Sequence, residues 1–195
     1  MGFTNGVLDL NTCTFRDGKA DDFISQSTGY DFEPDIDPEK EQELMTIFSQ
    51  ILPIPQVRQY FLTILASCID GEFNENPFYI LQNSSGANGK TLLMELMLKA
   101  FGQNEDGYGN KFNVAILLES RPSGAGAHPE MAKLRGKRFT YCEEPDENKP
   151  VNTGLLKELT GGGSITTRAL YKDPVTFEMQ TKFMMCYRSQ RRCII

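Results

Sequence analysis

The sequence has a single histidine, and its five cysteines are scattered along the chain. No two cysteines form a C-x-x-C pair, the spacing at which zinc sites often hold their ligands. With one histidine to join them, the cysteines do not predict a metal centre. They are typical of buried or unreactive thiols in a reducing compartment. The five are Cys13, Cys68, Cys142, Cys186 and Cys193.

Long apolar segments are also missing. No run is long enough to cross a bilayer, and the N-terminus has no basic stretch followed by an apolar one. The sequence therefore predicts a protein that is neither exported nor inserted in a membrane. Its 195 residues can build one large core, or a small accessory domain and one α/β domain.

The net charge is −6, but the two parts of the chain differ in sign. Residues 1–76 carry 14 acidic and 4 basic side chains, a net charge of −10. Residues 77–195 carry 12 acidic and 16 basic side chains, a net charge of +4. An acidic surface repels polyanions, so nucleic acid is compatible with the second part of the chain rather than the first.

Local patterns divide the chain into three segments. Residues 1–38 predict a hairpin followed by an extended connector, because Asn-Gly and Asp-Gly pairs flank a β-branched run and prolines follow. Residues 39–76 predict two amphipathic helices, since apolar residues recur at every third or fourth position over 44–52 and 57–68. These helices carry no chemical signature, and their simplest interpretation is a packing module. The third segment is 77–195.

The third segment alternates between predicted strands and helices. Its strands are short unbroken apolar runs, as expected of buried parallel strands. They are residues 78–81, 139–142 and 183–186. The predicted helices are 92–101 and 153–160, the predicted hairpin is 164–177, and a loop with an apolar piece at 114–118 covers 103–128. This order predicts an α/β fold with a mostly parallel sheet, preceded by the small helical segment.

A glycine-rich loop joins the first strand of this segment to its first helix. It contains Ser84, Ser85, Gly86, Ala87, Asn88, Gly89, Lys90 and Thr91. Strand, glycine-rich turn, Gly-Lys-Thr and helix is the order that a phosphate cradle requires, because backbone N–H groups and the helix N-terminus then face one anion. Lys90 would bind the β- and γ-phosphates of ATP, and the Thr91 hydroxyl would ligate Mg²⁺. The usual pattern begins with glycine where this chain has Ser84, and the alternative is a chance Gly-Lys-Thr in an ordinary loop.

An acidic pair follows the second predicted strand. Glu143 and Glu144 stand directly after residues 139–142, the position expected for groups that hold a metal and activate water. One glutamate would hold Mg²⁺ and the other would polarise the attacking water, and spacing does not assign the two roles. Asp146 and Glu147 follow closely, so a solvated acidic turn is the alternative.

Several motifs in a fixed order resemble the superfamily 3 helicases, most closely the poxvirus-type primase-helicases of large DNA viruses, phages and plasmids. They are the loop 86–91, the stretch 129–138, the strand ending in Glu143-Glu144-Pro145, the stretch 156–162 and the segment 168–172. The opening residues 3–10 and 21–25 resemble the segment that precedes the helicase domain in the large-virus members. The resemblance extends from the N-terminus to about Cys186.

The resemblance implies an AAA+-like P-loop NTPase core that assembles as a ring, usually a hexamer, and uses ATP hydrolysis to pull single-stranded DNA through its pore. It also implies a primase domain or other replication proteins as partners, at a replication site in the cytoplasm or nucleus of a virus-infected cell. The hairpin 164–177 corresponds to the pore-facing element, which makes Arg168 and Lys172 candidate contacts to the DNA backbone. A solvated hairpin, or ion pairs with Glu158 or Asp173, is the alternative.

The chain departs from the family pattern at one position. Members continue the last predicted strand into an asparagine that senses the γ-phosphate, and this chain has Tyr187 there. The residues after Cys186 no longer resemble the family, which predicts a C-terminally incomplete core from a truncated or frame-shifted gene. A remnant that binds nucleotide or a full-length partner without unwinding DNA is therefore the second hypothesis. A small-molecule phosphotransferase is the third, and the chain lacks an acceptor-site pattern and an arginine-rich lid.

Other basic residues have two interpretations. Arg135, Lys137 and Arg138 could face a neighbouring subunit's nucleotide or the DNA, or they could form a solvated basic turn. His128 is predicted to be structural or on the surface rather than catalytic.

Overall fold

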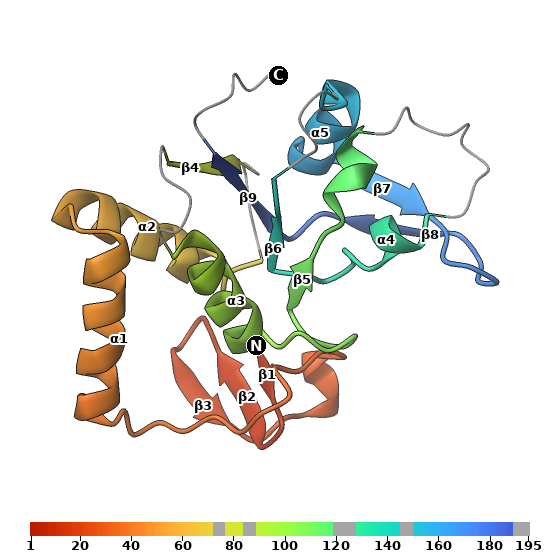
Figure 1. Cartoon of the computed structure of the whole chain (residues 1–195). Helices are drawn as coiled ribbons and strands as arrows, with labels where there is room; N and C mark the ends of the chain where they lie inside the picture. Colours follow the sequence, from red (N-terminus) through yellow and green to blue (C-terminus); the bar gives the residue numbers. More distant parts are fainter. Residues whose placement is uncertain (72–76, 84–88, 119–127, 145–149, 189–195) are drawn as a thin grey trace.

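The structure, a computed structural model, describes residues 1–71, 77–83, 89–118, 128–144 and 150–188. Three short strands and two helices come first, and strands then alternate with helices (Figure 1). The strands are β1 (Gly2–Phe3), β2 (Gly6–Asp9), β3 (Thr14–Arg16), β4 (Phe78–Asn83), β5 (Gly109–Lys111), β6 (Phe139–Cys142), β7 (Ser164–Thr167), β8 (Val175–Glu178) and β9 (Lys182–Arg188). The α-helices are α1 (Pro38–Ile51), α2 (Pro55–Ser67), α3 (Lys90–Ala100), α4 (Pro129–Ala132) and α5 (Thr153–Thr160), and the 3₁₀ helices are η1 (Ala20–Asp22) and η2 (Val114–Leu118).

Four strands form the central sheet, in the order β4-β9-β6-β5. Every neighbouring pair is parallel, and β9 lies between β4 and β6 although it comes last of the four in the chain. The carboxyl ends of all four strands therefore meet at one edge of the sheet. This confirms the predicted α/β fold with a parallel sheet.

One face of the sheet packs against α1, α2 and α3. Side chains alternate between the two faces of a strand, so β6 places Phe139 and Tyr141 on this face, and β9 adds Met184 and Cys186. The helices contribute apolar residues to the same cluster, namely Phe48, Phe61, Ile64, Leu65, Leu93, Met94 and Leu98. The helical pair α1–α2 is thus part of the core of the sheet.

The other face packs against η2, α4, α5 and the β7–β8 hairpin. The side chains on this face come from β6 and β9 and are buried in a second cluster, namely Cys142, Phe183, Met185 and Tyr187. Their partners include Leu117, Met131, Leu134, Leu155, Leu159 and Ile165. Two apolar layers enclose the sheet, which explains why its strands are unbroken apolar runs.

Both helices of the N-terminal pair begin earlier than the apolar periodicity predicts. The Asp37 side chain caps α1 by accepting the Glu39 N–H at 3.0 Å, and Pro38 takes the first helical position. Pro55 does the same for α2. The Asp37 cap and the two prolines fix where these helices start. The apolar stripe marks only the turns that pack in the core.

The N-terminal segment forms a three-stranded antiparallel sheet, β1-β2-β3, one strand more than the predicted hairpin. Tyr108 fastens it to the core, because its hydroxyl accepts the Gly2 N–H at 2.8 Å and donates to the Gln26 carbonyl at 2.9 Å. A β-carbon on Gly2 would lie 2.4 Å from that Gln26 oxygen. The close approach therefore requires glycine.

A buried lysine ties α2 to the sheet. Lys182, the first residue of β9, is 6% exposed and donates to the Ser67 carbonyl at 3.0 Å and to the Ser67 hydroxyl at 2.5 Å. Ser67 is the last residue of α2, so the ammonium group also faces the negative end of that helix. Removing this cation would leave the helix end without its charged donor.

Three of the described cysteines are buried, as their isolation in the sequence predicts. Burial raises the pKa of Cys68 and Cys142 to about 12 and that of Cys186 to about 11. These thiols stay protonated near neutral pH and are poor nucleophiles. Cys13 is exposed, and Cys193 lies outside the described residues.

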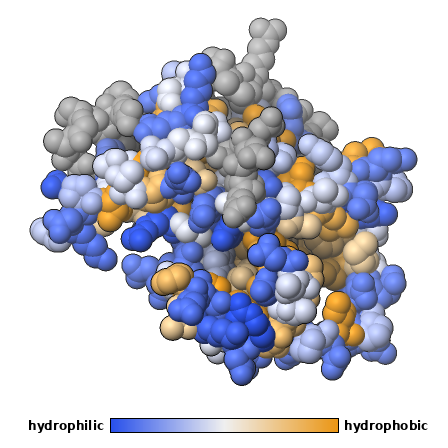
Figure 2. Space-filling view, turned by 180° about the vertical axis from the view of Figure 1, so that it is seen from behind, coloured by the Kyte–Doolittle hydropathy of each residue, from blue (hydrophilic) through white to orange (hydrophobic). Residues whose placement is uncertain are grey.

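Hydrophilic residues cover most of the surface seen in Figure 2, with apolar ones in separate patches. Several exposed apolar side chains belong to α1, α2 and the turn between them, namely Leu44, Met45, Ile54, Val57 and Tyr60. No helix in the described ranges is both long and apolar enough to span a bilayer.

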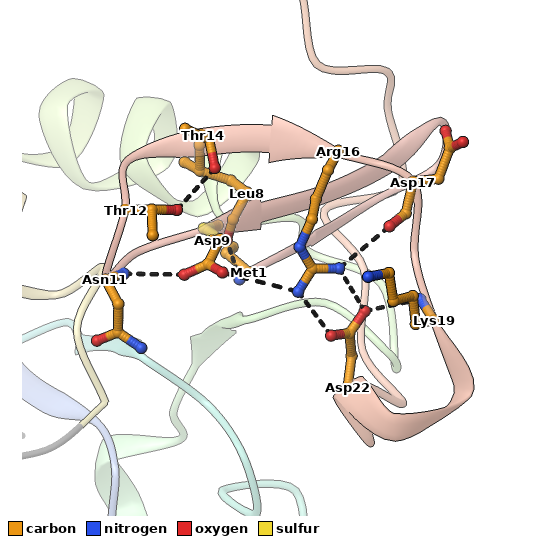
Figure 3. Close-up of polar contacts among 10 residues, drawn as sticks. All are labelled: Met1, Leu8, Asp9, Asn11, Thr12, Thr14, Arg16, Asp17, Lys19 and Asp22. Carbon is orange, nitrogen blue, oxygen red and sulfur yellow. Dashed lines mark hydrogen bonds and ion pairs between the residues drawn. The ribbon is translucent and has the colours of Figure 1, made fainter.

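We expect an ion pair in the N-terminal segment to make its stability depend on acid pH. Arg16 donates two hydrogen bonds to Asp22, at 2.9 and 2.7 Å, and Asp22 also accepts the Lys19 N–H (Figure 3). The Arg16 guanidinium, followed by the Lys19 N–H, holds the pKa of Asp22 well below its usual range. A lowered folded-state pKa contributes stability above the unfolded pKa, about 3.9, and that stability is lost as pH falls below it.

Asp22→Asn should therefore be less stable than the wild type at neutral pH, and the difference should shrink in acid. Urea denaturation at pH 7 and at about pH 3 measures both differences. Asp21→Asn is the matched control, since Asp21 is exposed beside it. A difference that stays constant across this pH range would contradict the prediction.

Candidate functional site

The predicted phosphate loop lies between β4 and α3, as the sequence requires. Residues 84–88, which include Ser84, Ser85, Gly86, Ala87 and Asn88, lie outside the described residues. Gly89, Lys90 and Thr91 are described, and they form the start of α3. The predicted strand and helix are therefore present on either side of it, with the helix beginning two residues earlier than the apolar pattern indicates.

The N-terminus of α3 has the features of an anion site. Gly89 is its N-cap with a left-handed backbone, φ +75°, and no side chain of the described residues caps the helix. The first N–H groups of a helix have no intrahelical acceptor, and the helix dipole makes this end positive. Lys90 is half-buried and Thr91 is exposed in the first turn. Backbone donors, a cation and a hydroxyl thus share one helix end.

The helical pair contacts this end of the loop directly. A β-carbon built on Gly89 would lie 2.7 Å from two carbon atoms of Ile51, the last residue of α1. Ile51 therefore lies against the glycine that begins α3. The α1–α2 pair, predicted only as a packing module, thus also contacts the start of α3.

The predicted acidic pair follows β6 at the same sheet edge. Glu143 comes directly after Cys142, and Lys111 at the end of neighbouring β5 donates to it at 2.7 Å. The bond to Glu143 is the main reason why the pKa of Lys111 is raised. Lys111 also lies 5.6 Å from the centre of the Tyr141 ring. Glu144 is half-buried, and Glu143 is exposed.

Lys90 and Glu143 act on one buried thiol. Burial is the main cause of the raised pKa of Cys186, the positive charge of Lys90 opposes it, and the negative charge of Glu143 adds to it. Lys90 follows β4 and Glu143 follows β6, the two strands that flank β9 in the parallel sheet, so both chain segments leave the sheet at the same edge. The structure thus brings together two site residues that are more than fifty positions apart in the sequence.

Tyr187 lies in β9, where the family resemblance expects asparagine. It pairs in register with Gln82 of β4 and is 7% exposed. Its side chain belongs to the cluster on the α5 face of the sheet. A large aromatic ring therefore fills a position where the resemblance implies a small polar group.

The predicted hairpin is β7–β8, and its tip carries Arg168 and Lys172, both exposed. The backbone N–H of His128 donates to the Arg168 carbonyl at 2.8 Å, and the Thr167 hydroxyl donates to the His128 carbonyl at 3.1 Å. His128 is half-buried at the start of α4, in agreement with its predicted structural role. The hairpin is therefore fixed to α4 near its tip.

The basic stretch after α4 is not a uniform solvated turn. Lys137 is 4% exposed and donates to the carbonyls of Asn104, Glu105 and Gly107. Burial is the main cause that lowers its pKa. Both interpretations offered for Lys137 are wrong, because its ammonium group holds a loop. Arg135 is exposed, and Arg138 lies over Gly71, where a β-carbon would be 0.9 Å from a guanidinium nitrogen.

We expect Gly89→Ala to destabilise the protein for two separable reasons. A left-handed backbone costs a residue with a side chain about 1–2 kcal/mol. The new methyl group would also collide with Ile51. In an Ile51→Ala background only the backbone cost should remain, so the double-mutant cycle should show coupling.

Urea denaturation of the four variants measures this coupling. Gly163→Ala is the matched control, because nothing lies within 4 Å of its added β-carbon. Additive effects of Gly89→Ala and Ile51→Ala would show that the contact does not exist in solution.

Comparison with known proteins shows what the chain is similar to. Residues 81–189, more than half of the chain, match DUF5906, described as a family of unknown function. Residues 1–55 match the family described as D5 N terminal like. The solved apo structure of the NrS-1 C terminal region matches 74% of this chain and 33% of its own, with a TM-score of 0.56 and 15% identity, which supports the fold.

Curated relatives are longer than this chain. The "Putative helicase L207/L206" of Acanthamoeba polyphaga mimivirus is 42% identical over 188 residues, which are 95% of this chain and 19% of the relative. A "Putative primase" of African swine fever virus is 28% identical over 183 residues, 92% of this chain and 18% of the relative. The chain spans about a fifth of the length of these relatives. The D5-like N-terminus and the likeness to these relatives support a poxvirus-type primase-helicase, and the chain belongs to the DUF5906 family.

Proposed function

We propose that the chain binds ATP with Mg²⁺ at the start of α3 and hydrolyses it as part of a superfamily 3 DNA helicase. One observation carries the proposal. The N-terminus of α3, with Lys90 and Thr91, follows the carboxyl end of β4, at the sheet edge where Glu143 follows β6. Phosphate needs positive donors there, and Mg²⁺ needs oxygen ligands beside them.

The residues present fit this pair of ligands. Lys90 supplies a full positive charge to the phosphates, and the N–H groups of the first turn add hydrogen bonds. The Thr91 hydroxyl and the Glu143 or Glu144 carboxylate are the hard oxygen ligands that Mg²⁺ prefers. When bound, Mg²⁺ neutralises charge on the phosphates. The remaining glutamate accepts a hydrogen bond from the attacking water and orients it.

Single-stranded DNA is the proposed polymer substrate. Arg168 and Lys172 are exposed at the tip of the β7–β8 hairpin, where cations can reach a phosphate backbone. A homo-oligomeric, hexameric ring and a primase or other replication partner follow from the family resemblance. The names of the relatives, a helicase and a primase, support this assignment. A replication site in the nucleus or cytoplasm of an infected cell is the corresponding location.

Nucleotide binding without hydrolysis is the second candidate function. Tyr187 favours it, because a buried tyrosine stands where the resemblance implies a γ-phosphate sensor. The loss would affect turnover rather than the binding of phosphate at α3. Measurements of binding and of hydrolysis therefore separate the two candidates.

Lys90→Ala should abolish the binding of ATP with Mg²⁺, because it removes the only full positive charge among the described residues of the loop. Isothermal titration calorimetry of the purified chain measures this directly. Lys99→Ala is the matched control, since Lys99 is exposed at the far end of the same helix. Equal affinity for ATP in wild type and Lys90→Ala would remove the central proposal.

Glu143→Gln and Glu144→Gln should each retain ATP binding and lose hydrolysis, by about 10²–10⁴-fold for the residue that orients water. The variant that loses a metal ligand should also need more Mg²⁺ to bind ATP. Steady-state hydrolysis with and without single-stranded DNA gives the rates, and Glu39→Gln, at an exposed position of α1, is the control. A wild type with tight ATP binding and no hydrolysis at any protein concentration would establish the second candidate.

A further inference from the structure

The hairpin tip presents an aromatic side chain fully to solvent. Tyr171 is 104% exposed, and its neighbour Leu170 is 59% exposed. Tyr171 also has a left-handed backbone, φ +59°, which is uncommon for a residue with a bulky side chain. No packing in the described structure explains this exposure and this conformation. Strained, exposed positions of this kind occur where a side chain is held out for a ligand.

The base of the hairpin is fixed, so the tip projects from a firm support. Ile165 is 2% exposed in the core, and the hydroxyls of Thr166 and Thr176 lie 2.9 Å apart across the two strands. The contacts of His128 described above hold the far end of β7. In Figure 1 the hairpin lies on the opposite side of the molecule from α1.

A basic cavity opens beside the tip. It has a volume of about 920 Å³ and lies between β5, α4 and the hairpin. Lys172 lines it from the hairpin, and Lys133 and Arg135 line it from the stretch after α4, against two acidic residues, Asp173 and Glu105. Lys133 pairs with Glu130 at 2.5 Å. Within the described ranges, no ion pair engages Arg135 or Lys172.

We propose that Tyr171 stacks against a base of single-stranded nucleic acid, while Lys172 and Arg135 bind the adjoining phosphates in this cavity. Proteins that bind single strands combine an exposed aromatic ring with nearby cations, because every base has a face that can stack and every phosphate carries a negative charge. A duplex hides its base faces, so the site selects single strands. The inference rests on the proposed DNA binding and adds a stacking residue and a phosphate contact, Arg135, to it.

The stacking part is tested by equilibrium binding of a fluorescent oligothymidylate to the whole chain, followed by anisotropy. Tyr171→Ala should weaken binding between about fivefold and a hundredfold, and Tyr171→Phe should restore it, because the ring face is sufficient. Tyr60→Ala, which removes another exposed tyrosine, should leave binding unchanged. An oligonucleotide of abasic sites should bind wild type and Tyr171→Ala equally.

The proposed phosphate contacts of Arg135 and Lys172 are tested by the salt dependence of binding. Each lost phosphate contact should reduce the slope of log affinity against log salt by about 0.7 for a single strand. Arg135→Ala and Lys172→Ala should each show this reduction, whereas Tyr171→Ala should weaken binding without changing the slope. Lys40→Ala, on the other side of the molecule, should change neither affinity nor slope.

The outcomes separate this inference from the proposed function. If wild type binds no single strand, the proposed DNA binding itself fails. If Arg168→Ala and Lys172→Ala weaken binding while Tyr171→Ala does not, DNA binding stands and the stacking role is overturned. A Tyr171→Ala effect that persists with the abasic strand would also overturn stacking. Loss of self-association in Tyr171→Ala, with unchanged DNA binding, would assign the tip to contact with a second copy instead.

Discussion

Parallel pairing of the four central strands is the constraint on which the candidate site depends. Because β4, β9, β6 and β5 all run the same way, the chain segments that carry Lys90, the acidic pair and Lys111 leave the sheet at one edge although they come from distant parts of the chain. The insertion of β9 between β4 and β6 gives the strands that precede Lys90 and Glu143 a common neighbour. A single reversed strand would carry its functional residue to the opposite edge. Burial of the sheet on both faces keeps the strands in this order, since each contributes apolar side chains to two separate clusters.

The contact between Ile51 and Gly89 gives the helical pair a role in the site. Lys182 ties the end of α2 to the sheet through its two hydrogen bonds to Ser67. Ile51, at the end of α1, lies against Gly89 at the start of α3. The family boundary is consistent with this dependence, because the D5 N terminal like match continues through residue 55 and includes the whole of α1. The three-segment division read from composition remains a prediction. The contacts across it show that the segments do not pack independently.

The sequence predicted the elements that bury apolar runs and missed those that do not. β4, β6, β9 and the hairpin were visible because their burial patterns follow their sequences. The sequence predicts a loop where β5 lies, because Gly-Asn-Lys has no apolar residue, and it gives no signal for Lys111. Only tertiary contacts define β5: Gly109 fits closely against Leu98, and the strand pairs with β6. The buried position of Lys137 is likewise invisible in the sequence. A lysine in a basic stretch is expected in solvent, and only the folded loop at 104–107 supplies the carbonyls that bind it.

The ion pair between Lys111 and Glu143 at this edge of the sheet is weak enough for a ligand to replace either partner. Lys111 and Glu143 keep side-chain exposures of 46% and 54%, and an exposed ion pair contributes roughly 0–1 kcal/mol because water screens both charges. A ligand that offers Glu143 a divalent cation, or Lys111 a phosphate oxygen, therefore has little pairing energy to overcome. Lys182 is the contrasting case: it is buried at a helix end and donates to two oxygens, so replacing its partners would leave a desolvated charge. The chain thus keeps its buried cations for architecture and leaves exposed charges available at the proposed site.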